Sequence, residues 1–150
     1  MRNDQEGLPR PADDSPFVDA ILQWRPTWFL ARLLLVRAYL LGGIVKLTDW
    51  QAAVAEQAHF GMVPPAFWAG CTIAVELAGS LLILSGRLIW LGAGMLGVFT
   101  LLAAITANAF WTMPAGQELF MATNAFFEHL GLIGGFILLT MVAQRPNRHA

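Results

Sequence analysis

The residues of this chain best suited to chemistry are charged groups inside apolar segments. Five ionisable side chains other than histidine have such surroundings: Arg32, Arg37, Lys46, Glu76 and Glu128. The first three share one short run, ARLLLVRAYLLGGIVKL, at residues 31–47. Groups of this kind form ion pairs, mark proton or solute pathways, or bind the polar head of a ligand. Which of these applies depends on the segments that carry them.

The composition predicts that those segments cross a membrane. Apolar side chains make up 57% of the 150 residues and charged ones only 13%, about half the share in an ordinary globular domain. A bilayer core about 30 Å thick takes roughly 20 mostly apolar residues per helix. Four runs qualify, at about 28–47, 67–84, 88–110 and 125–143. We therefore predict an all-α, integral membrane four-helix bundle, because a soluble domain would lack the polar surface to cover such helices.

Shorter elements flank these spans. Residues 1–16 lack periodic apolar positions and are predicted to form a disordered leader, with one domain over 17–150. Ser15 and Pro16 are typical of a helix start and predict a short helix lying on the membrane surface. The stretch WQAAVAEQAHF, after Thr48 and Asp49, predicts a helical loop between the first two spans.

Orientation follows from the cations outside the spans. Arg2, Arg10 and Arg25 precede the first span, Arg87 lies between the second and third, and Arg145 and Arg148 follow the fourth. The other two loops carry acids instead, including Glu56 and Glu118. Positively charged loops stay in the cytoplasm, so both termini are expected there. An acidic leader before the first apolar run does not resemble a cleaved secretory signal.

Position along each span predicts how the embedded charges meet. Arg37 and Glu76 each lie near the middle of neighbouring antiparallel spans, which predicts a buried Arg37–Glu76 pair. In the alternative, Arg37 extends toward the membrane surface and Glu76 is protonated against a hydroxyl or backbone group. Arg32 and Lys46 are fourteen residues apart, which leaves them only about 40° apart around the helix. Arg32 is expected near the inner surface and Lys46 at the outer end.

A polar pocket is predicted in the outer half of the bundle. Lys46, Asn108, Glu128 and His129 lie at the outer ends of their spans, with Glu76 below them. Together they would open toward the outer leaflet. Small residues four apart predict close helix packing within the chain, although the same pattern between chains would give a homo-oligomer. They are Gly70, Ala74 and Ala78, then Ala93 and Gly97, then Gly131 and Gly135.

Several classes of function are disfavoured. A net charge of −1 argues against nucleic-acid binding, and a lone Cys71 rules out a disulfide framework or a C-x-x-C redox pair within the chain. His59, Glu128 and His129 lack the helical spacing of a metal site, and only one histidine lies in a span, which disfavours haem. No nucleotide-binding or hydrolase motif is present. We expect no metal and no encoded cofactor.

The order and spacing of several motifs resemble the DoxX-like family of small four-span bacterial membrane proteins, over about residues 28–143. The motifs are R-x(10)-G-x-x-K-L from Arg32 to Leu47, Gly61 with Pro64, Glu76 with Gly79, Gly86-Arg87, Phe110-Trp111 and the closing FFEHLGLIGGFILL. The resemblance implies a four-helix bundle in the bacterial cytoplasmic (inner) membrane. Related proteins include a subunit of a thiosulfate:quinone oxidoreductase and a membrane partner in an oxidative-stress complex.

Carried over by residue, the resemblance makes Arg32, Lys46 and Glu76 recurrent polar positions of the family. Arg37 is outside that pattern, and Glu128-His129 stands where the family has a different polar pair.

Three functional hypotheses follow. The first is a subunit without its own redox centre that binds a quinone and associates with an oxidoreductase, with Lys46, Asn108 and His129 as donors to the quinone head. The second is a proton or small-solute transporter with Arg37 and Glu76 on its path. The third is a scaffold of a membrane complex whose charges only fix the helix register. Whether the chain has catalytic activity is left open by the sequence.

Overall fold

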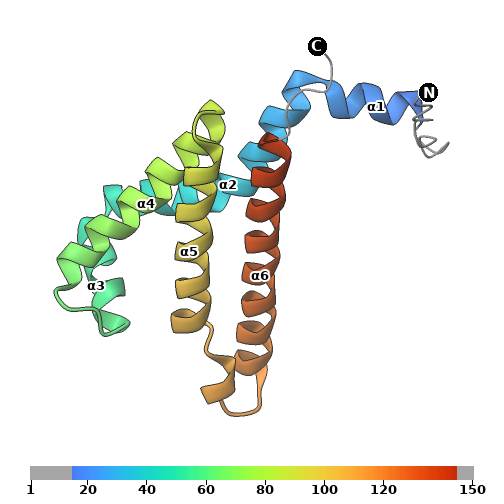
Figure 1. Cartoon of the computed structure of the whole chain (residues 1–150). Helices are drawn as coiled ribbons and strands as arrows, with labels where there is room; N and C mark the ends of the chain where they lie inside the picture. Colours follow the sequence, from blue (N-terminus) through green and yellow to red (C-terminus); the bar gives the residue numbers. More distant parts are fainter. Residues whose placement is uncertain (1–14, 145–150) are drawn as a thin grey trace, which may run out of the picture.

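The computed structural model describes residues 15–144, and every regular element among them is helical (Figure 1). The helices are α1 (Pro16–Gln23), α2 (Arg25–Thr48), α3 (Trp50–His59), α4 (Pro65–Ser85), α5 (Ile89–Ala107), the 3-10 turn η1 (Phe110–Thr112) and α6 (Gln117–Ala143). Helices α2, α4, α5 and α6 are long and apolar enough to cross a membrane. The predicted all-α, four-span class is therefore confirmed. Most of the predicted leader, at residues 1–14, and the arginines at 145 and 148 lie outside the described residues.

The helix bounds differ from the predicted spans mainly at α6. This helix begins at Gln117, eight residues before the predicted start at 125, because it continues through the polar stretch that precedes the apolar run. Glu118 lies in its first turn, where a carboxylate interacts favourably with the helix dipole. Helix α5 ends at Ala107 rather than near 110, and η1 follows it. Apolar content therefore located the spans but not the ends of their helices.

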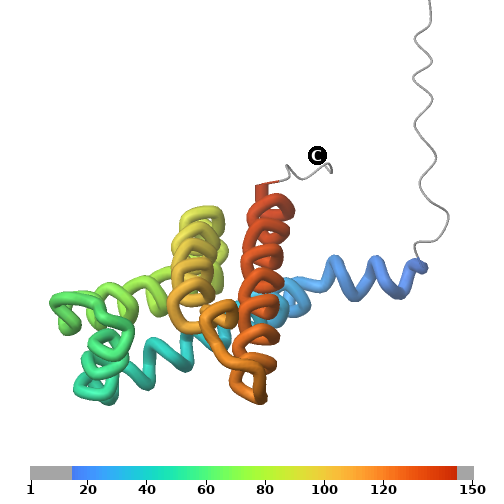
Figure 2. The backbone as a smooth tube through the Cα atoms, turned by 90° about the horizontal axis from the view of Figure 1, so that it is seen from below, coloured from blue at the N-terminus to red at the C-terminus, as the bar shows by residue number. Residues whose placement is uncertain are grey.

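The four long helices pack in chain order. Helix α2 packs on α4, α4 on α5, and α5 on α6, while α3 covers one end of α4. Figures 1 and 2 show α5 and α6 side by side, with α2 crossing the group obliquely. The termini of the described chain and the α4–α5 turn lie at one end, and α3 lies toward the other (Figure 1). The buried core is formed by Val36, Tyr39, Ile83, Ala93, Leu96 and Phe136.

One hydrogen bond ties the first span to the third inside this core. The side-chain oxygens of Tyr39 and Thr100 lie 2.6 Å apart. The hydroxyl of Thr100 donates to the carbonyl of Leu96, so Tyr39 is the donor in the bond between the two side chains. The ring of Tyr39 also packs against Phe136 of α6, with centroids 5.7 Å apart. Tyr39 thus connects three spans and leaves no hydroxyl hydrogen unpaired.

Glycines set the closest helix approaches. A Cβ atom on Gly92 of α5 would lie 2.6 Å from the carbonyl oxygen of Gly79 of α4, and one on Gly43 of α2 would lie 2.7 Å from the side chain of Leu77. Real Cβ atoms do not approach other atoms so closely. Small residues therefore do allow close packing within the chain, but not at all the expected positions. Ala74 and Ala78 of the predicted stripe are exposed.

Helix α1 lies outside this packing. It projects from the start of α2, and each of its residues is exposed (Figures 1 and 2). Pro16 occupies the first turn as predicted, although Ser15 makes no side-chain cap hydrogen bond. Phe17, Ile21 and Leu22 remain uncovered, as expected of a helix that lies in the interfacial region of a bilayer.

The contact between Gly79 and Gly92 predicts a strong effect of one methyl group. Gly92→Ala should destabilise the protein by about 1–3 kcal/mol, the usual cost of overpacking, because the clash is with backbone that has to move. Thermal unfolding of the purified protein measures this loss. Gly97→Ala in the same helix is the control, since a Cβ there meets nothing within 4 Å. Equal melting temperatures for both variants would contradict this description of the seam.

Candidate ligand-binding site at Lys46 and Glu76

A lysine and a glutamate from the first two spans form the central ion pair. Lys46 Nζ lies 3.1 Å from Glu76 Oε1 and 3.3 Å from Oε2, so the ammonium donates to both carboxylate oxygens. Glu76 is only 5% exposed, and the Lys46 side chain is 17% exposed. A single charge at the bilayer centre costs on the order of 2.5–3.5 kcal/mol. The pair offsets that cost for both residues.

Gly42 leaves the space in which this pair forms. A Cβ atom at residue 42 would lie 3.3 Å from Glu76 Oε1 and 3.5 Å from Lys46 Nζ. Because Gly42 has no side chain, the carboxylate of α4 can rest against the backbone of α2. The Gly42-Gly43 pair thus allows α2 and α4 to pack closely. Gly42 leaves room for the ion pair, and Gly43 leaves room for the side chain of Leu77.

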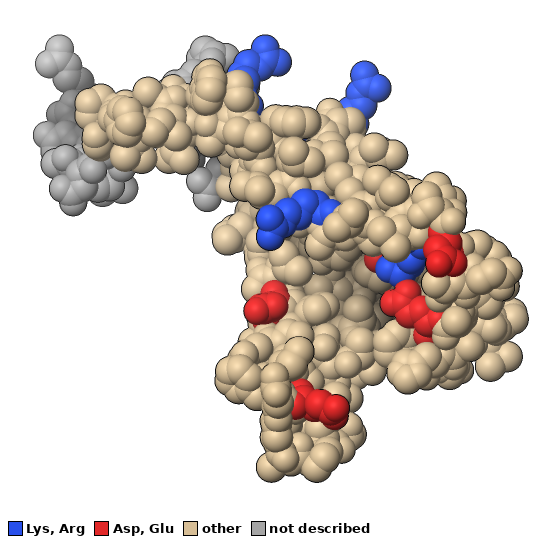
Figure 3. Space-filling model, turned by 180° about the vertical axis from the view of Figure 1, so that it is seen from behind, with Lys and Arg blue, Asp and Glu red and all other residues tan. Residues whose placement is uncertain are grey.

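Helix α3 brings a second carboxylate to the lysine. Glu56 Oε2 lies 3.9 Å from Lys46 Nζ, too far for a hydrogen bond, and its side chain is 44% exposed. The helix begins at Asp49, whose carboxylate accepts a hydrogen bond from the amide of Ala52, as the sequence predicts. Its buried residues are Ala53 and Gln57. On the face shown in Figure 3, blue and red side chains meet where α3 covers the molecule.

The expected pairing of Arg37 with Glu76 is wrong. Arg37 is exposed, and among residues 15–144 it has no salt bridge; Glu76 pairs with Lys46 instead. The reason is helical phase. Lys46 is nine residues beyond Arg37, about two and a half turns, so the two cations point in opposite directions from α2. Arg37 therefore faces away from α4. This agrees with the alternative prediction for this residue, in which its side chain extends toward the membrane surface.

Arg32 lies on the Lys46 face of α2, at the opposite end of the contact with α4. Its Nη1 would be 3.0 Å from a Cβ atom on Gly86, the residue that ends α4 with a φ of 74°. Its Nε is buried, with no hydrogen-bond partner among the described residues. Arg32 thus packs against the α4–α5 turn and not against Glu76.

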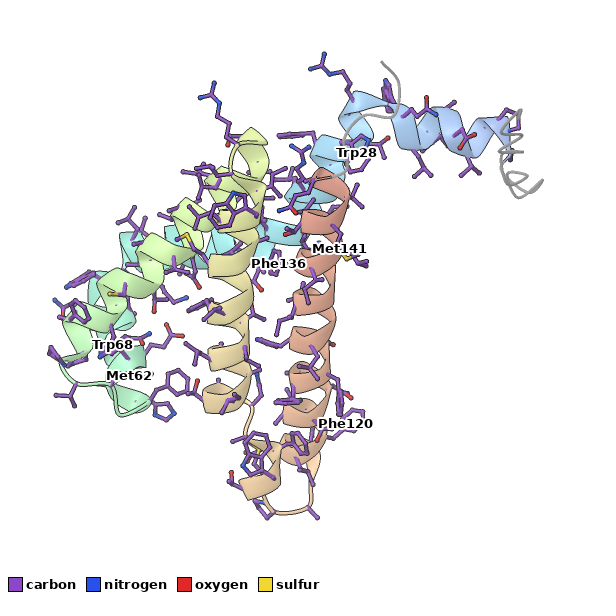
Figure 4. All side chains as sticks on the ribbon, in the orientation of Figure 1. Trp28, Met62, Trp68, Phe120, Phe136 and Met141 are labelled. Atoms are coloured by element: carbon purple, nitrogen blue, oxygen red, sulfur yellow. The ribbon has the colours of Figure 1, made fainter. Side chains whose placement is uncertain are left out.

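A cavity of about 560 Å³ adjoins the ion pair. It lies between α3, α4 and α5, and its walls are mostly apolar. Figure 4 shows Trp68 and Met62 together near the α3 end of α4, and both line it. Helix α5 contributes several wall residues that are exposed, including Val98 and Leu102. The polar residues of its wall are Lys46, Glu56, Gln57, Thr72 and Thr106, and Cys71 also lines it.

Three predicted members of the pocket lie elsewhere. Asn108, Glu128 and His129 do not line this cavity and make no hydrogen bond or salt bridge to Lys46 or Glu76. Glu128 is exposed, and Nδ1 of His129 donates to the carbonyl of Ala125, 2.6 Å away, in its own helix. Because α5 separates α6 from α4, residues at the start of α6 do not reach the ion pair.

Sequence reasoning missed the contribution of α3. The sequence predicts the helix that carries Glu56 and Gln57 but gives neither residue a role at the site, yet Glu56 approaches the lysine and Gln57 is buried where α3 packs on α4. One signal was available: Ala53 and Gln57 are four residues apart and share a helix face. Residues 15–144 contain no group of three His, Cys, Asp or Glu side chains placed to hold a metal ion.

Fold and site together define a multi-pass helical membrane protein with an ion pair beside an apolar cavity. A family model described as DoxX matches residues 27–109, more than half of the chain and the region from α2 to α5. The chain belongs to the DoxX family. No curated protein and no solved structure matches this sequence.

The ion pair predicts that a substitution of Glu76 destabilises the protein and that a substitution of Arg37 does not. Glu76→Gln should lower the free energy of unfolding by roughly 1.5–3 kcal/mol, the contribution of hydrogen bonds to a charged group. Arg37→Gln should leave it within about 0.5 kcal/mol, as for other exposed positions. Thermal unfolding of both purified variants tests this. A more damaging effect at Arg37 than at Glu76 would contradict the observed pairing.

Proposed function

We propose that this protein is a quinone-binding membrane subunit, without a redox centre of its own, that works with an oxidoreductase partner. The observation that carries the proposal is the cavity of about 560 Å³ whose wall includes Lys46, the lysine that is paired with Glu76. This volume is typical of the cavities in which proteins bind small ligands. Most such cavities have apolar walls and a few polar groups that fix the orientation of the ligand. A quinone has matching parts: an apolar tail and a head with carbonyl acceptors.

Lys46 has one proton left for such a head. Two of its three N–H groups are used by the two oxygens of Glu76. The third is nearest to Glu56, at a distance that leaves it without a hydrogen bond. A carbonyl oxygen in the cavity could accept this proton without disturbing the buried pair. Glu76 then has a supporting role, because its two hydrogen bonds hold the lysine in place.

The wall formed by α5 supports entry of the ligand from lipid. Val98 and Leu102 are 61% and 57% exposed, and they belong to a helix that spans the membrane. Such residues contact acyl chains. A long apolar tail could therefore remain partly in the bilayer while the head reaches Lys46, so the cavity need not enclose the whole molecule.

Location and partner complete the proposal. We place the protein in the bacterial inner membrane with both termini in the cytoplasm, which puts α3 and the cavity toward the outer leaflet. The start of α2 with Arg25 and the α4–α5 turn with Arg87 share one end of the molecule, which agrees with that orientation (Figure 1). Electrons would come from, or pass to, a redox group of the oxidoreductase partner.

Filling the cavity should abolish quinone binding. We expect Ala103→Phe, in the cavity wall, to eliminate quenching of tryptophan fluorescence by decylubiquinone in lipid nanodiscs, since Trp68 lines the same cavity. Wild-type protein should also melt at a higher temperature when the quinone is present.

Leu101→Phe is the matched control, because residue 101 lies in the same helix but lines the groove between α5 and α6. It should bind like the wild type. If the wild-type protein shows neither quenching nor stabilisation, the scaffold role becomes the better account. Proton flux in proteoliposomes that Glu76→Gln abolishes would instead favour transport.

A further inference from the structure

Gln57 is a buried polar side chain with unused hydrogen-bonding capacity. It is only 7% exposed, it lies on the face of α3 that packs against α4, and it lines the cavity. Its carboxamide has two N–H donors and one carbonyl acceptor. Among residues 15–144, no hydrogen bond from this side chain to another group is found. Within the same residues, neither polar atom of this side chain is among the fully buried groups without a partner, which are Arg32 Nε and Ser80 Oγ. The amide is therefore open to the cavity, and its hydrogen-bonding groups are available to a molecule there.

Thr72 shows the same feature on the opposite wall. Threonines inside a helix usually donate to a carbonyl one turn earlier, and Thr100, Thr106, Thr123 and Thr140 all do so. The hydroxyl of Thr72 makes no such bond, and Thr72 lines the cavity. It lies one turn before Glu76, on the same face of α4. The free hydroxyl thus continues the polar side of the cavity away from the ion pair.

We infer that Gln57 and Thr72 form a second hydrogen-bonding position of the cavity, which recognises an oxygen of the ligand head separately from Lys46. The inference rests on the proposed function and names the residues that select the ligand. The ammonium of Lys46 only donates, whereas the amide and the hydroxyl both donate and accept. Such a position accepts a carbonyl oxygen or a hydroxyl group equally well. The cavity therefore suits both the oxidised and the reduced form of a quinone.

A role in recognition and a role in folding predict different effects on stability. If Gln57 supported the fold, replacing it with an apolar side chain of similar size would lower the melting temperature. If its amide serves a ligand, the same change breaks no hydrogen bond of the ligand-free protein and does not lower its melting temperature. A fall of less than about 2 °C, or a rise, is therefore expected.

The test uses Gln57→Leu in lipid nanodiscs, with decylubiquinone and decylubiquinol as probes and tryptophan quenching as the binding signal. We expect the dissociation constant for each form to rise roughly tenfold, while the melting temperature of the ligand-free protein is unchanged or higher. Thr72→Val, which replaces the hydroxyl with a methyl group of similar size, should weaken binding of both forms and leave the melting temperature unchanged or higher. Gln51→Leu, at an exposed position of the same helix, should change neither binding nor melting.

The outcomes separate this inference from the proposed function. Wild-type affinity in both Gln57→Leu and Thr72→Val would overturn the inference and leave quinone binding intact. If the wild type binds neither probe, the proposed function fails and the melting temperature alone tests the inference: a Gln57→Leu protein at least as stable as the wild type supports an amide available to a ligand. A less stable or unfolded one overturns it, because Gln57 then belongs to the fold.

Discussion

The structure depends on pairing a carboxylate with an ammonium where water is scarce. An isolated charge in the hydrocarbon region is costly, and Glu76 and Lys46 each have the other as an opposite charge at hydrogen-bond distance. This requirement fixes the contact of α2 with α4, since Gly42 has to lie directly against the carboxylate. It also fixes the end of α2 near α3, because the lysine reaches the pair from the last turn of its helix. A single electrostatic constraint thus sets the relative position of the first two spans.

The sequential packing of the spans explains why the cavity exists. Each long helix packs mainly on its neighbours in the chain, so α2 and α6 do not close the group into a ring. The space beside α4 and α5 at the α3 end is left to the short helix α3, which covers it only partly. An apolar region that opens to lipid at its side and ends at a charged pair results from this arrangement. The site is thus a consequence of the topology and not of one motif.

The sequence predicted the spans because hydrophobic length is a strong signal in a bilayer. It also placed Arg32 and Lys46 on one face of the first span, and both face α4. The wrong partner for Glu76 has a specific origin: depth, estimated from position in each span, was given more weight than helical phase, which places Arg37 opposite Lys46. The packing order could not be read from the sequence either, so Glu128 and His129 were expected near a lysine from which α5 separates them. Gln57 was missed because its spacing from Ala53, a single small residue on the same helix face, is a weak sign of burial.

The last helix stands apart from the rest. Helix α6 packs on α5 and η1, it reaches the core mainly through Phe136, and the DoxX match ends at residue 109, before it begins. The cavity and the ion pair are complete without it. A chain shortened before α6 would therefore keep every residue of the ion pair and of the cavity wall, and would lose the packing of Phe136 against Tyr39.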